Sequence, residues 1–450
     1  MRRAVVLFTG DLRLHDHPPL RAAVAAADEV VPLFVLDPAV ARVGFAAPVR
    51  QAFLAGCLAD LDAGLRERGG RLVVREGDPV TEVCAVAAEC GATEVHLAAA
   101  DSGFGQRRED RLRDALGAAG CRLHVHDTVV TAVPPGALTP QGSDHFAVFT
   151  PYFRHWSAQR LRDTLPAPRT VRVPDSVRSA DLPAVPSGGQ AAGGERAARR
   201  RLSAWLRGGL GSYDTGQDDL AGDSTSRLSA HLHFGTLSAV ETVHRARAAG
   251  GPGADAFVRQ LCWRDFNRQL LAARPSVSLA DYRDRHDRWR TGKAAEADAE
   301  AWREGRTGYP VVDAAMRQML SEGWMHNRGR LLVASFLTKT LYVDWRVGAR
   351  YFLDRLVDGD VANNQLNWQW VAGTGTDTRP NRVLNPVLQA RRHDPDGAYV
   401  RRWVPELAAV EGPAVHEPWK LPEIDRKGYP QPLVDLSEAR ARFQQARGLG

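Results

Sequence analysis

The chain has 450 residues, more than one hydrophobic core usually accommodates, so its length predicts two domains. Lys and Arg outnumber Asp and Glu by 59 to 53, and the net charge of +6 fits a polyanionic partner such as nucleic acid. The five cysteines lack the spacing of a disulfide framework or a metal site, so we expect reduced thiols, no bound metal and a cytoplasmic location. The apolar run at the start is too short for a signal peptide, and no segment reaches membrane-spanning length.

Short strand-like runs alternate with helical segments from residue 4 to about residue 130. The apolar or β-branched runs are residues 4–8, 30–36, 71–75, 94–98 and 122–126, and the helical candidates include residues 48–68 and 79–90. This alternation predicts an α/β domain over residues 1–130, with a doubly wound parallel sheet covered by helices on both faces. The first run leads into Thr9-Gly10-Asp11, which lacks the glycine pattern of a dinucleotide fold, so a nicotinamide dehydrogenase is disfavoured.

Residues 131–194 are rich in Pro, Gly, Ser and Arg and predict a long interdomain linker. The aromatic side chains of residues 149–153 are expected to pin this linker to a domain surface. From residue 195 to residue 450 the apolar period changes to 3.6, which predicts an all-α domain with helices near residues 254–273, 311–322, 326–342 and 348–357. Nine of the eleven tryptophans lie in this half, between Trp263 and Trp419.

Three predicted helical faces mix aromatic and amide side chains. The first holds Asn364 and Trp368, with Asp360 expected at or just before the start of that helix. The second holds Gln260, Trp263 and Arg264, and the third holds Trp324, Asn327 and Leu331. Any single face of this kind is more often ordinary core. Because buried polar groups need partners, three such faces favour a site for a polar cofactor or substrate.

Three long blocks stand out in this half: Thr307-Gly308-Tyr309-Pro310-Val311-Val312-Asp313, Gly323-Trp324-Met325-His326-Asn327-Arg328, and the run from Asp358-Gly359-Asp360 through Asn364 to Trp368. These blocks resemble the signature blocks of the photolyase and cryptochrome family. Within the family the chain is similar to class I cyclobutane pyrimidine dimer photolyases. The resemblance implies a monomeric DNA-repair lyase that binds UV-damaged DNA, in which blue or near-UV light drives electron transfer from reduced FAD and splits the dimer into two pyrimidines.

The same resemblance makes the helical domain FAD-binding. The implied contacts to the diphosphate, ribose and flavin are Tyr213, Thr225, Ser226, Arg227, Leu228, Ser229, Phe257, Asp358, Gly359, Asp360 and Asn364. Hydroxyl side chains that open a helix offer donors to an anion, although such a run is more often a helix cap. Asn364 matches the residue beside the central-ring nitrogen of the flavin. The implied electron relay to oxidised flavin is Trp368, Trp345 and Trp289, with Trp302 as the alternative to Trp289.

Lesion and DNA contacts are implied for a further set of side chains. They are Gln260, Trp263, Arg264, Asn327, Arg328 and Gln389, with Arg391, Arg392, Arg401 and Arg402 as phosphate contacts or as a solvated basic surface. Many relatives carry Glu at the position of Gln260 and Met at that of Leu331. Gln cannot supply a proton, so we expect these departures to change the rate of dimer splitting rather than the reaction.

A light-harvesting antenna is expected in the N-terminal domain. The resemblance favours 8-hydroxy-5-deazaflavin, with methenyltetrahydrofolate or an empty site as alternatives. The candidate contacts, which could equally cap strands and helices, are Leu36, Asp37, Arg50 and Asp101.

Three other functions compete with dimer repair. A cryptochrome-type photoreceptor is disfavoured because the last helical segment, residues 437–446, lies close to the end of the chain and leaves little room for a signalling tail. A dark flavin oxidoreductase is disfavoured by the missing nicotinamide fingerprint. Repair of (6-4) photoproducts is disfavoured because it needs a proton delivered to the lesion, which the eukaryotic (6-4) enzymes of this family supply from two histidines. At the matching positions this chain has Asn327 and Leu331, and only the preceding His326 remains.

Overall fold

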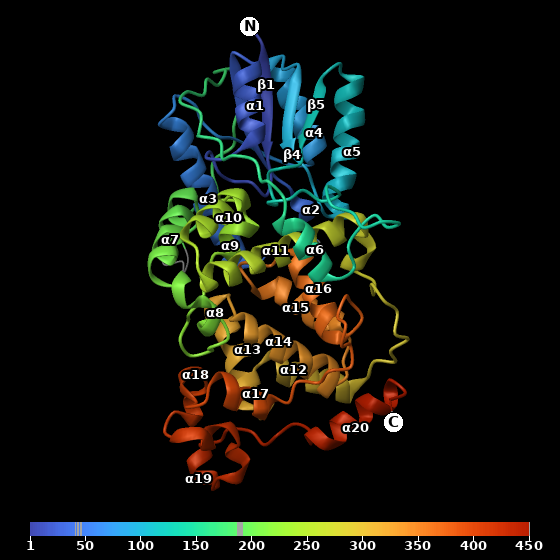
Figure 1. Cartoon of the computed structure of the whole chain (residues 1–450). Coiled ribbons are helices and arrows are strands. Elements are labelled where there is room, and N and C mark those ends of the chain that lie inside the picture. Colours follow the sequence, from blue (N-terminus) through green and yellow to red (C-terminus); the bar gives the residue numbers. More distant parts are fainter. Residues whose placement is uncertain (41, 43–44, 46, 187–191, 450) are drawn as a thin grey trace. The chain divides into compact units, whose positions relative to one another are not determined.

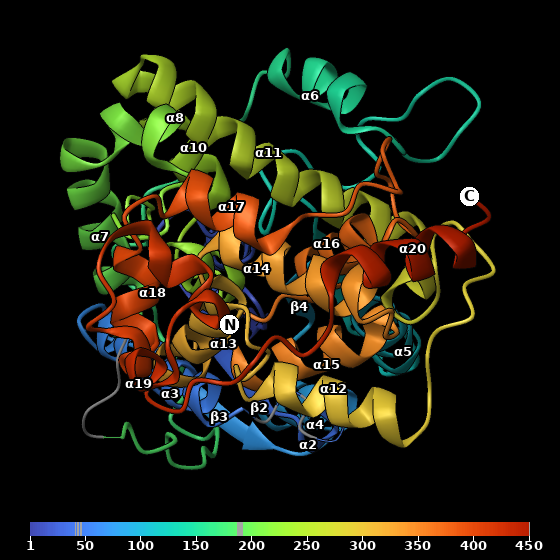
Figure 2. The same cartoon turned by 90° about the horizontal axis from the view of Figure 1, so that it is seen from below.

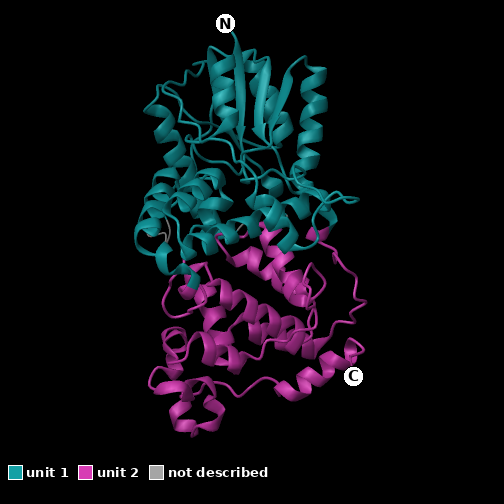
Figure 3. Cartoon of the chain, viewed as in Figure 1, with its two compact units in different colours: residues 1–214, 226–276 teal, residues 215–225, 277–450 magenta. Residues whose placement is uncertain are grey.

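The computed structural model describes residues 1–40, 42, 45, 47–186 and 192–449. The chain forms two compact units, Met1–Asp214 with Ser226–Ser276, and Thr215–Thr225 with Val277–Gly450 (Figure 3). These units divide the chain differently from the expected boundaries near residues 130 and 194, which stay a prediction. Among the described residues, no helix is both long and apolar enough to cross a membrane.

The first unit contains a five-stranded parallel sheet in the order β3-β2-β1-β4-β5. Its strands are β1 (Arg3–Phe8), β2 (Glu29–Leu36), β3 (Val73–Glu76), β4 (Glu94–Ala98) and β5 (Arg122–His126). The connecting helices are α1 (Pro18–Ala26), α2 (Pro38–Val40), α3 (Pro48–Arg66), α4 (Pro79–Cys90) and α5 (Gly103–Ala118) (Figure 1). The predicted doubly wound α/β architecture is therefore confirmed.

Strand alternation separates an apolar face of this sheet from a more polar one. Val5, Leu7, Val95 and Leu97 are fully or almost fully buried and pack with apolar residues of α4 and α5. Each side chain of this size stabilises the fold by roughly 1.5–3 kcal/mol when it leaves water. The helices begin where capping side chains occur: Asp78 accepts from Thr81 N at the start of α4.

The predicted linker, residues 131–194, packs against the helical part of the same unit. Its described residues contain one helix, α6 (Phe149–Ser157). Trp156 on this helix is fully buried, and its Nε1 donates to Asp265 Oδ2 at 3.0 Å. Phe149 stacks on Trp263 with ring centroids 3.6 Å apart, so the prediction that aromatic residues pin this segment is confirmed.

Helices from residue 195 onward also belong to the first unit. They are α7 (Glu195–Gly208), the 3-10 turn Leu210–Ser212, α9 (Ser229–His233), α10 (Ala239–Ala249) and α11 (Pro252–Ala273). Buried Arg13, after β1, donates to Gly235 O at 2.9 Å and to Val129 O at 2.8 Å. Glu195 accepts from Leu14 N at 2.7 Å. These bonds explain why the sheet and the helices of residues 195–276 fall into one compact unit.

The described elements of the second unit are all helical, as predicted (Figure 2). They include α12 (Lys293–Arg303), α13 (Pro310–Glu322), α14 (Asn327–Ser335), a π-helix (Phe336–Thr340), α15 (Trp345–Arg355), α16 (Val361–Ala372), α17 (Pro386–His393), α18 (Ala398–Trp403), α19 (Glu423–Arg426) and α20 (Leu436–Ala446). Two short helices, α8 (Tyr213–Gly216) and a 3-10 turn (Pro275–Ser278), lie where the units divide the chain.

The Thr307–Asp313 block has a structural role in the second unit. Asp313 Oδ1 accepts from Thr307 N and Thr307 Oγ1, each at 2.7 Å, and Oδ2 accepts from Gly308 N at 3.1 Å. Tyr429 also donates its hydroxyl to this buried carboxyl. The block therefore fixes the start of α13 and contributes packing rather than chemistry.

Candidate active site

Asn364 is held on α16 with its amide nitrogen committed to the protein. Asp360 caps this helix, since its Oδ1 accepts from Asn363 N at 2.8 Å. Asn364 Nδ2 donates to Ala349 O and to Gln365 Oε1, each at 2.9 Å. These bonds use both amide protons, so Oδ1 is the atom that this side chain can offer to a bound molecule as an acceptor.

The carboxylate of Asp358 is buried and paired. Arg330 NH2 contacts Asp358 Oδ1 at 3.1 Å and Oδ2 at 2.8 Å, and only 2% of the Asp358 side chain is exposed. Arg330 is itself held by a bond from Nε to Met325 O at 2.9 Å. Asp360 N donates to Asp358 O at 2.7 Å, so the Asp358-Gly359-Asp360 segment turns tightly into α16.

Four tryptophans belong to one hydrophobic core of the second unit: Trp368, Trp345 and Trp302 are buried in it, and half-buried Trp289 packs against it. The Trp302 ring lies 6.0 Å from that of Trp368, and Trp289 lies 5.0 Å from the Tyr342 ring. Trp345 Nε1 donates to Asp281 Oδ1 at 2.8 Å. Because Trp302 is fully buried and Trp289 is partly exposed, Trp289 is the better candidate for an outer relay position.

An aromatic cluster in the first unit joins two predicted cofactor contacts. The rings of Tyr213 and Phe257 meet edge to face at 5.7 Å, and Trp205 lies 5.5 Å from Tyr213 and 5.9 Å from Phe257. Trp205 was not predicted, because it lies on α7, outside the resembling blocks.

The Thr225–Ser229 segment is not a helix cap. Helix α9 begins at Ser229 after Leu228, and no side chain caps it, so the helix-cap interpretation is wrong. Ser226 Oγ accepts from Leu228 N at 3.3 Å, and Arg227 has a left-handed backbone with φ of 49°. Such a conformation is costly for a residue with a side chain and is common at ligand sites. Thr225 Oγ1 is buried without a hydrogen-bond partner, so this segment fits a bound group that offers polar atoms.

Helix α11 places Gln260, Trp263 and Arg264 on one stretch, but their surroundings differ. One face of the half-buried Trp263 ring is covered by Phe149, with an interplanar angle of 4°. Arg264 is buried and donates to Val130 O at 2.8 Å and to Leu232 O at 3.0 Å, which are contacts within the protein. Sequence reasoning missed Arg259, whose guanidinium lies 4.9 Å from the Phe149 ring centroid.

The third predicted face is wrong. His326 caps α14 by accepting from Arg328 N at 3.1 Å, so Trp324 lies before the helix and does not share a helical face with Asn327 and Leu331. Asn327 is exposed at the first turn of α14, and Arg328 contacts Asp218 Oδ1 at 3.1 Å through Nε. Gln389 lies half-buried on α17, apart in sequence from both.

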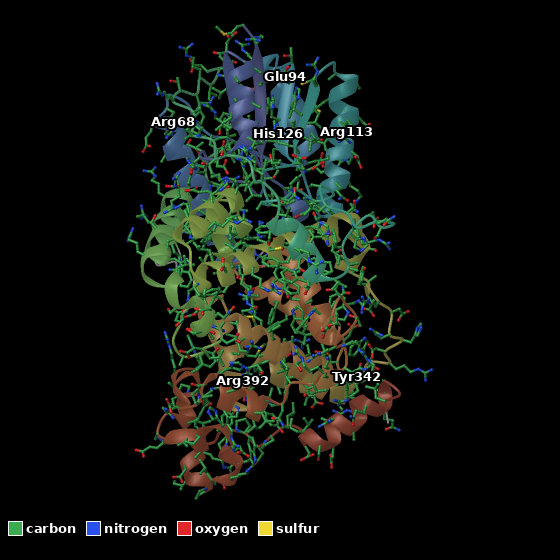
Figure 4. The ribbon with its side chains drawn as sticks, viewed as in Figure 1. Arg68, Glu94, Arg113, His126, Tyr342 and Arg392 are labelled. Carbon is green, nitrogen blue, oxygen red and sulfur yellow. The ribbon has the colours of Figure 1, made fainter. Side chains whose placement is uncertain are left out.

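Three of the four arginines at positions 391, 392, 401 and 402 contact other groups of the protein. Arg391 pairs with Glu417, Arg401 NH1 donates to Val410 O at 3.1 Å, and Arg402 lies 5.3 Å from the Trp403 ring. Arg392 is exposed on α17 (Figure 4). A hollow of about 520 Å³, lined by Arg391, Glu417 and Lys420 among others, lies beside this stretch and contains none of the predicted flavin contacts.

The antenna candidates lie at the carboxyl side of the sheet in the first unit. Leu36 ends β2, Asp37 Oδ1 accepts from Ala39 N at 2.8 Å, and Asp101 pairs with Arg268. Arg50 is buried on α3, 4.9 Å from the Phe45 ring centroid. Arg108 on α5 was not predicted. Its Nε is buried without a hydrogen-bond partner, and burial lowers the pKa of its guanidinium despite Glu109 and Asp37.

Comparisons with known proteins identify the class to which this fold and these residues belong. A family described as DNA photolyase matches residues 4–170, and the FAD binding domain of DNA photolyase matches residues 257–448. A class III photolyase from Agrobacterium tumefaciens has a similar structure, with a TM-score of 0.91 and 33% identity, covering 100% of this chain and 97% of that one. An archaeal photolyase from Sulfolobus tokodaii, solved with two FAD molecules, has a TM-score of 0.87 and 31% identity, covering 99% of each chain.

The chain therefore belongs to the photolyase and cryptochrome family. Among its relatives is a deoxyribodipyrimidine photo-lyase from Streptomyces griseus, which is 66% identical over 458 aligned residues and is covered, like this chain, over 100% of its length.

Proposed function

We propose that this chain is a class I cyclobutane pyrimidine dimer photolyase, a lyase that repairs UV-damaged DNA with blue or near-UV light. The observation that carries the proposal is the 66% identity with a deoxyribodipyrimidine photo-lyase over the whole of both chains. We further propose that it acts as a monomer in the cytoplasm.

The proposed FAD contacts are residues whose polar atoms are already oriented. Arg330 holds the Asp358 carboxylate, the Asn364 oxygen is left as a neutral acceptor, and Thr225 Oγ1 lacks a partner within the protein. We assign Tyr213, Ser226, Arg227, Leu228, Ser229, Phe257, Gly359 and Asp360 to the same cofactor. FAD in its reduced form supplies the light-driven electron that opens the dimer. A neutral amide beside the flavin adds no charge, so Asn364 can orient the ring without opposing loss of that electron.

Electron resupply is assigned to Trp368, Trp345 and Trp289. Indole oxidises more easily than phenyl and packs well in an apolar core. Trp345 is held by Asp281, whose carboxylate favours positive charge on the neighbouring ring. Half-buried Trp289 is the member that reaches solvent.

Lesion recognition is assigned to Trp263, Gln260, Asn327, Arg328 and Gln389, and to Arg264 through its support of α11. An enzyme that acts on paired bases must take them out of the stack, and flat side chains such as Trp263 offer a stacking surface. Because Phe149 covers one face of Trp263, the lesion would use the other. Exposed Asn327 can donate to a pyrimidine carbonyl, and Arg328 to a phosphate.

An antenna in the first unit is supported by two cationic side chains near the ends of the strands, buried Arg50 and half-buried Arg108, whose Nε has no hydrogen-bond partner. We propose 8-hydroxy-5-deazaflavin, contacted by Leu36, Asp37, Arg50 and Asp101. Mass analysis of the chromophores released from purified protein checks this, and release of a folate or a second FAD would contradict it.

The test of the main proposal is repair in light and darkness. FAD-containing protein is mixed with thymine-dimer oligonucleotide, and the recovery of pyrimidine absorbance is followed. We expect recovery only under illumination. No recovery with reduced flavin and bound DNA would instead indicate a photoreceptor of the cryptochrome kind, and recovery in darkness would contradict light-driven chemistry.

A further inference from the structure

Three side chains with metal-binding atoms meet on the polar face of the sheet in the first unit. In the parallel pairing of β4 with β5, His96 is the register partner of His124, and Glu94 lies two residues before His96. Side chains two residues apart in a strand point to the same face, so all three project together. Figure 4 labels Glu94 on β4, and it labels His126 near the end of β5.

The distances between their ligand atoms suit one small cation. Glu94 Oε2 lies 3.5 Å from His96 Nε2 and 3.7 Å from His124 Nε2. One ligand atom from each of the three residues lies within 4.8 Å of those of the other two. A tetrahedral ion with ligands at about 2.0–2.1 Å separates them by roughly 3.3–3.4 Å, which the two Glu94 distances nearly match. The His96 and His124 rings are stacked with centroids 4.6 Å apart, so both would tilt toward the ion on binding.

The imidazole nitrogens that face the Glu94 carboxylate make no hydrogen bond to another group of the described residues. Nε2 of His96 and Nε2 of His124 are both buried without a hydrogen-bond partner. His96 Nδ1 contacts His126 Nε2 at 3.1 Å, and when Nδ1 donates this proton, His96 Nε2 carries a lone pair directed toward Glu94. A second hydrogen bond of this kind orients metal-bound histidines in general.

The cluster also has access to solvent, and it is separate from the residues assigned to flavin and DNA. β5 is an edge strand, and the His124 and Glu94 side chains are 35% and 25% exposed, whereas His96 is 4% exposed. A cationic side chain beside the cluster is Arg122, whose NH1 lies 3.6 Å from Glu94 Oε1. Its side chain is 72% exposed, so it can move away at little cost.

We propose that Glu94, His96 and His124 bind a divalent transition-metal ion, best matched by Zn²⁺, with His126 as a positioning residue. Two imidazoles and one carboxylate suit Zn²⁺ rather than Mg²⁺ or Ca²⁺, which prefer oxygen ligands alone. Three protein ligands leave the fourth position to water. The ion would join β4 to the edge strand β5. The competing occupant of the same gap is a proton on one imidazole, paired with Glu94.

The test measures zinc on the full-length, FAD-containing protein. The protein is stripped with a chelator and dialysed. Zinc binding is then titrated against a chromophoric zinc indicator, and the absorption edge of the bound metal gives its ligand distances. We expect one zinc per chain, with nitrogen and oxygen ligands at about 2.0–2.1 Å.

Four variants localise the ion. Glu94→Gln and His124→Ala should each weaken zinc binding more than tenfold, and His126→Phe should weaken it by about 10–100-fold, as removal of a supporting hydrogen bond does. His286→Ala, at an exposed histidine beside Asp284 in the second unit, should leave binding unchanged. Flavin absorbance and thermal unfolding in chelator confirm that each variant is folded.

Two results would overturn the proposal. One is the absence of stoichiometric zinc on folded wild-type protein, which would leave the proton as occupant. The other is zinc that all variants bind equally, or that has sulfur ligands near 2.3 Å, which would place it at cysteines.

Discussion

At the scale of single residues, the surroundings of His326 make this histidine a poor proton donor. Burial lowers its pKa to about 4, although Asp218 and Asp223 oppose this shift, and its Nδ1 is used to cap α14. The ring is therefore neutral near pH 7 and poorly suited to deliver a proton. Asn327, one position on, cannot act as an acid at all.

We accordingly expect light-driven repair of cyclobutane dimers and no appreciable repair of (6-4) photoproducts. Splitting a cyclobutane dimer needs one electron, which reduced flavin transfers to the dimer and which returns to the flavin after the bonds open. Repair of a (6-4) photoproduct also needs a proton at the lesion. Reduced enzyme is illuminated with each lesion in a separate oligonucleotide, and the products are resolved by chromatography. Selective loss of the (6-4) lesion would contradict the assignment.

Trp368 provides a second prediction at this scale. Trp368→Phe should block photoreduction of oxidised flavin, because phenyl is harder to oxidise than indole, while repair by chemically reduced enzyme should stay near the wild-type rate. Flavin absorbance under illumination measures the first and dimer repair the second. Trp403→Phe, at the edge of the same core, is the matched control and should photoreduce normally. Normal photoreduction by Trp368→Phe would remove Trp368 from the relay.

At the scale of elements, Gly348 sets how closely α15 approaches α16. A Cβ on Gly348 would lie 2.1 Å from the Trp368 ring and 2.7 Å from Leu337. Both neighbours are buried, so neither can move freely. Only a residue without a side chain allows the Trp368 ring to approach this helix so closely.

Gly348→Ala should therefore destabilise the protein by about 1–3 kcal/mol, the usual cost of overpacking a core, although Ala is the better helix former. It should also slow photoreduction, because the Trp368 ring must shift. Gly208→Ala, at the end of α7 with nothing within 4 Å of the new Cβ, is the control and should be neutral or slightly stabilising. Urea unfolding measures both, and equal stability of the two variants would contradict the packing argument.

Sequence patterns predicted the elements better than the contacts between them. β4 and β5 match their expected bounds, because β-branched and apolar residues stand between clear turn signals. Asp360 caps α16 as its spacing from Asn364 indicated. The break at Trp324 was missed because capping by His326 is not a usual signal. The Glu94, His96 and His124 cluster was missed because strand pairing, rather than spacing in the chain, brings it together.

Contacts between residues that lie far apart in the chain also could not be predicted from the sequence. Nothing local indicates that Phe149 stacks on Trp263, more than a hundred residues later, or that Trp205 joins Tyr213 and Phe257. The flavin and lesion residues came from resemblance, and their assignments stay predictions.

At the scale of the whole molecule, buried neutral histidines predict a dependence of stability on pH. Burial lowers the pKa of His231 and of His326 to about 4, from an ordinary value of 6.5. Between these values the unfolded chain binds more protons than the folded one. The stability that depends on these two neutral rings is therefore fully present above about pH 6.5, and it is lost as the pH falls toward 4.

Lowering the pH from 7 to 5 should cost about 1–2 kcal/mol for each of these rings. His326→Asn, which keeps a capping side chain but removes the titrating ring, should flatten the dependence. Exposed His286→Asn should not. Urea midpoints at both pH values measure the effect, and identical slopes for wild type and His326→Asn would show that His326 does not contribute.

The buried Arg13 has a consequence for the order in which the protein is made. Its partner Gly235 lies 222 residues later in the chain, and Glu195, which accepts from the Leu14 backbone, lies 181 residues later. While the N-terminal strands leave the ribosome, this guanidinium therefore has no complete set of acceptors, and a buried unpaired charge is costly. The sheet can gain its full stability only after about half of the chain has been synthesised. Until then, nascent chains should remain open to proteolysis and dependent on chaperones.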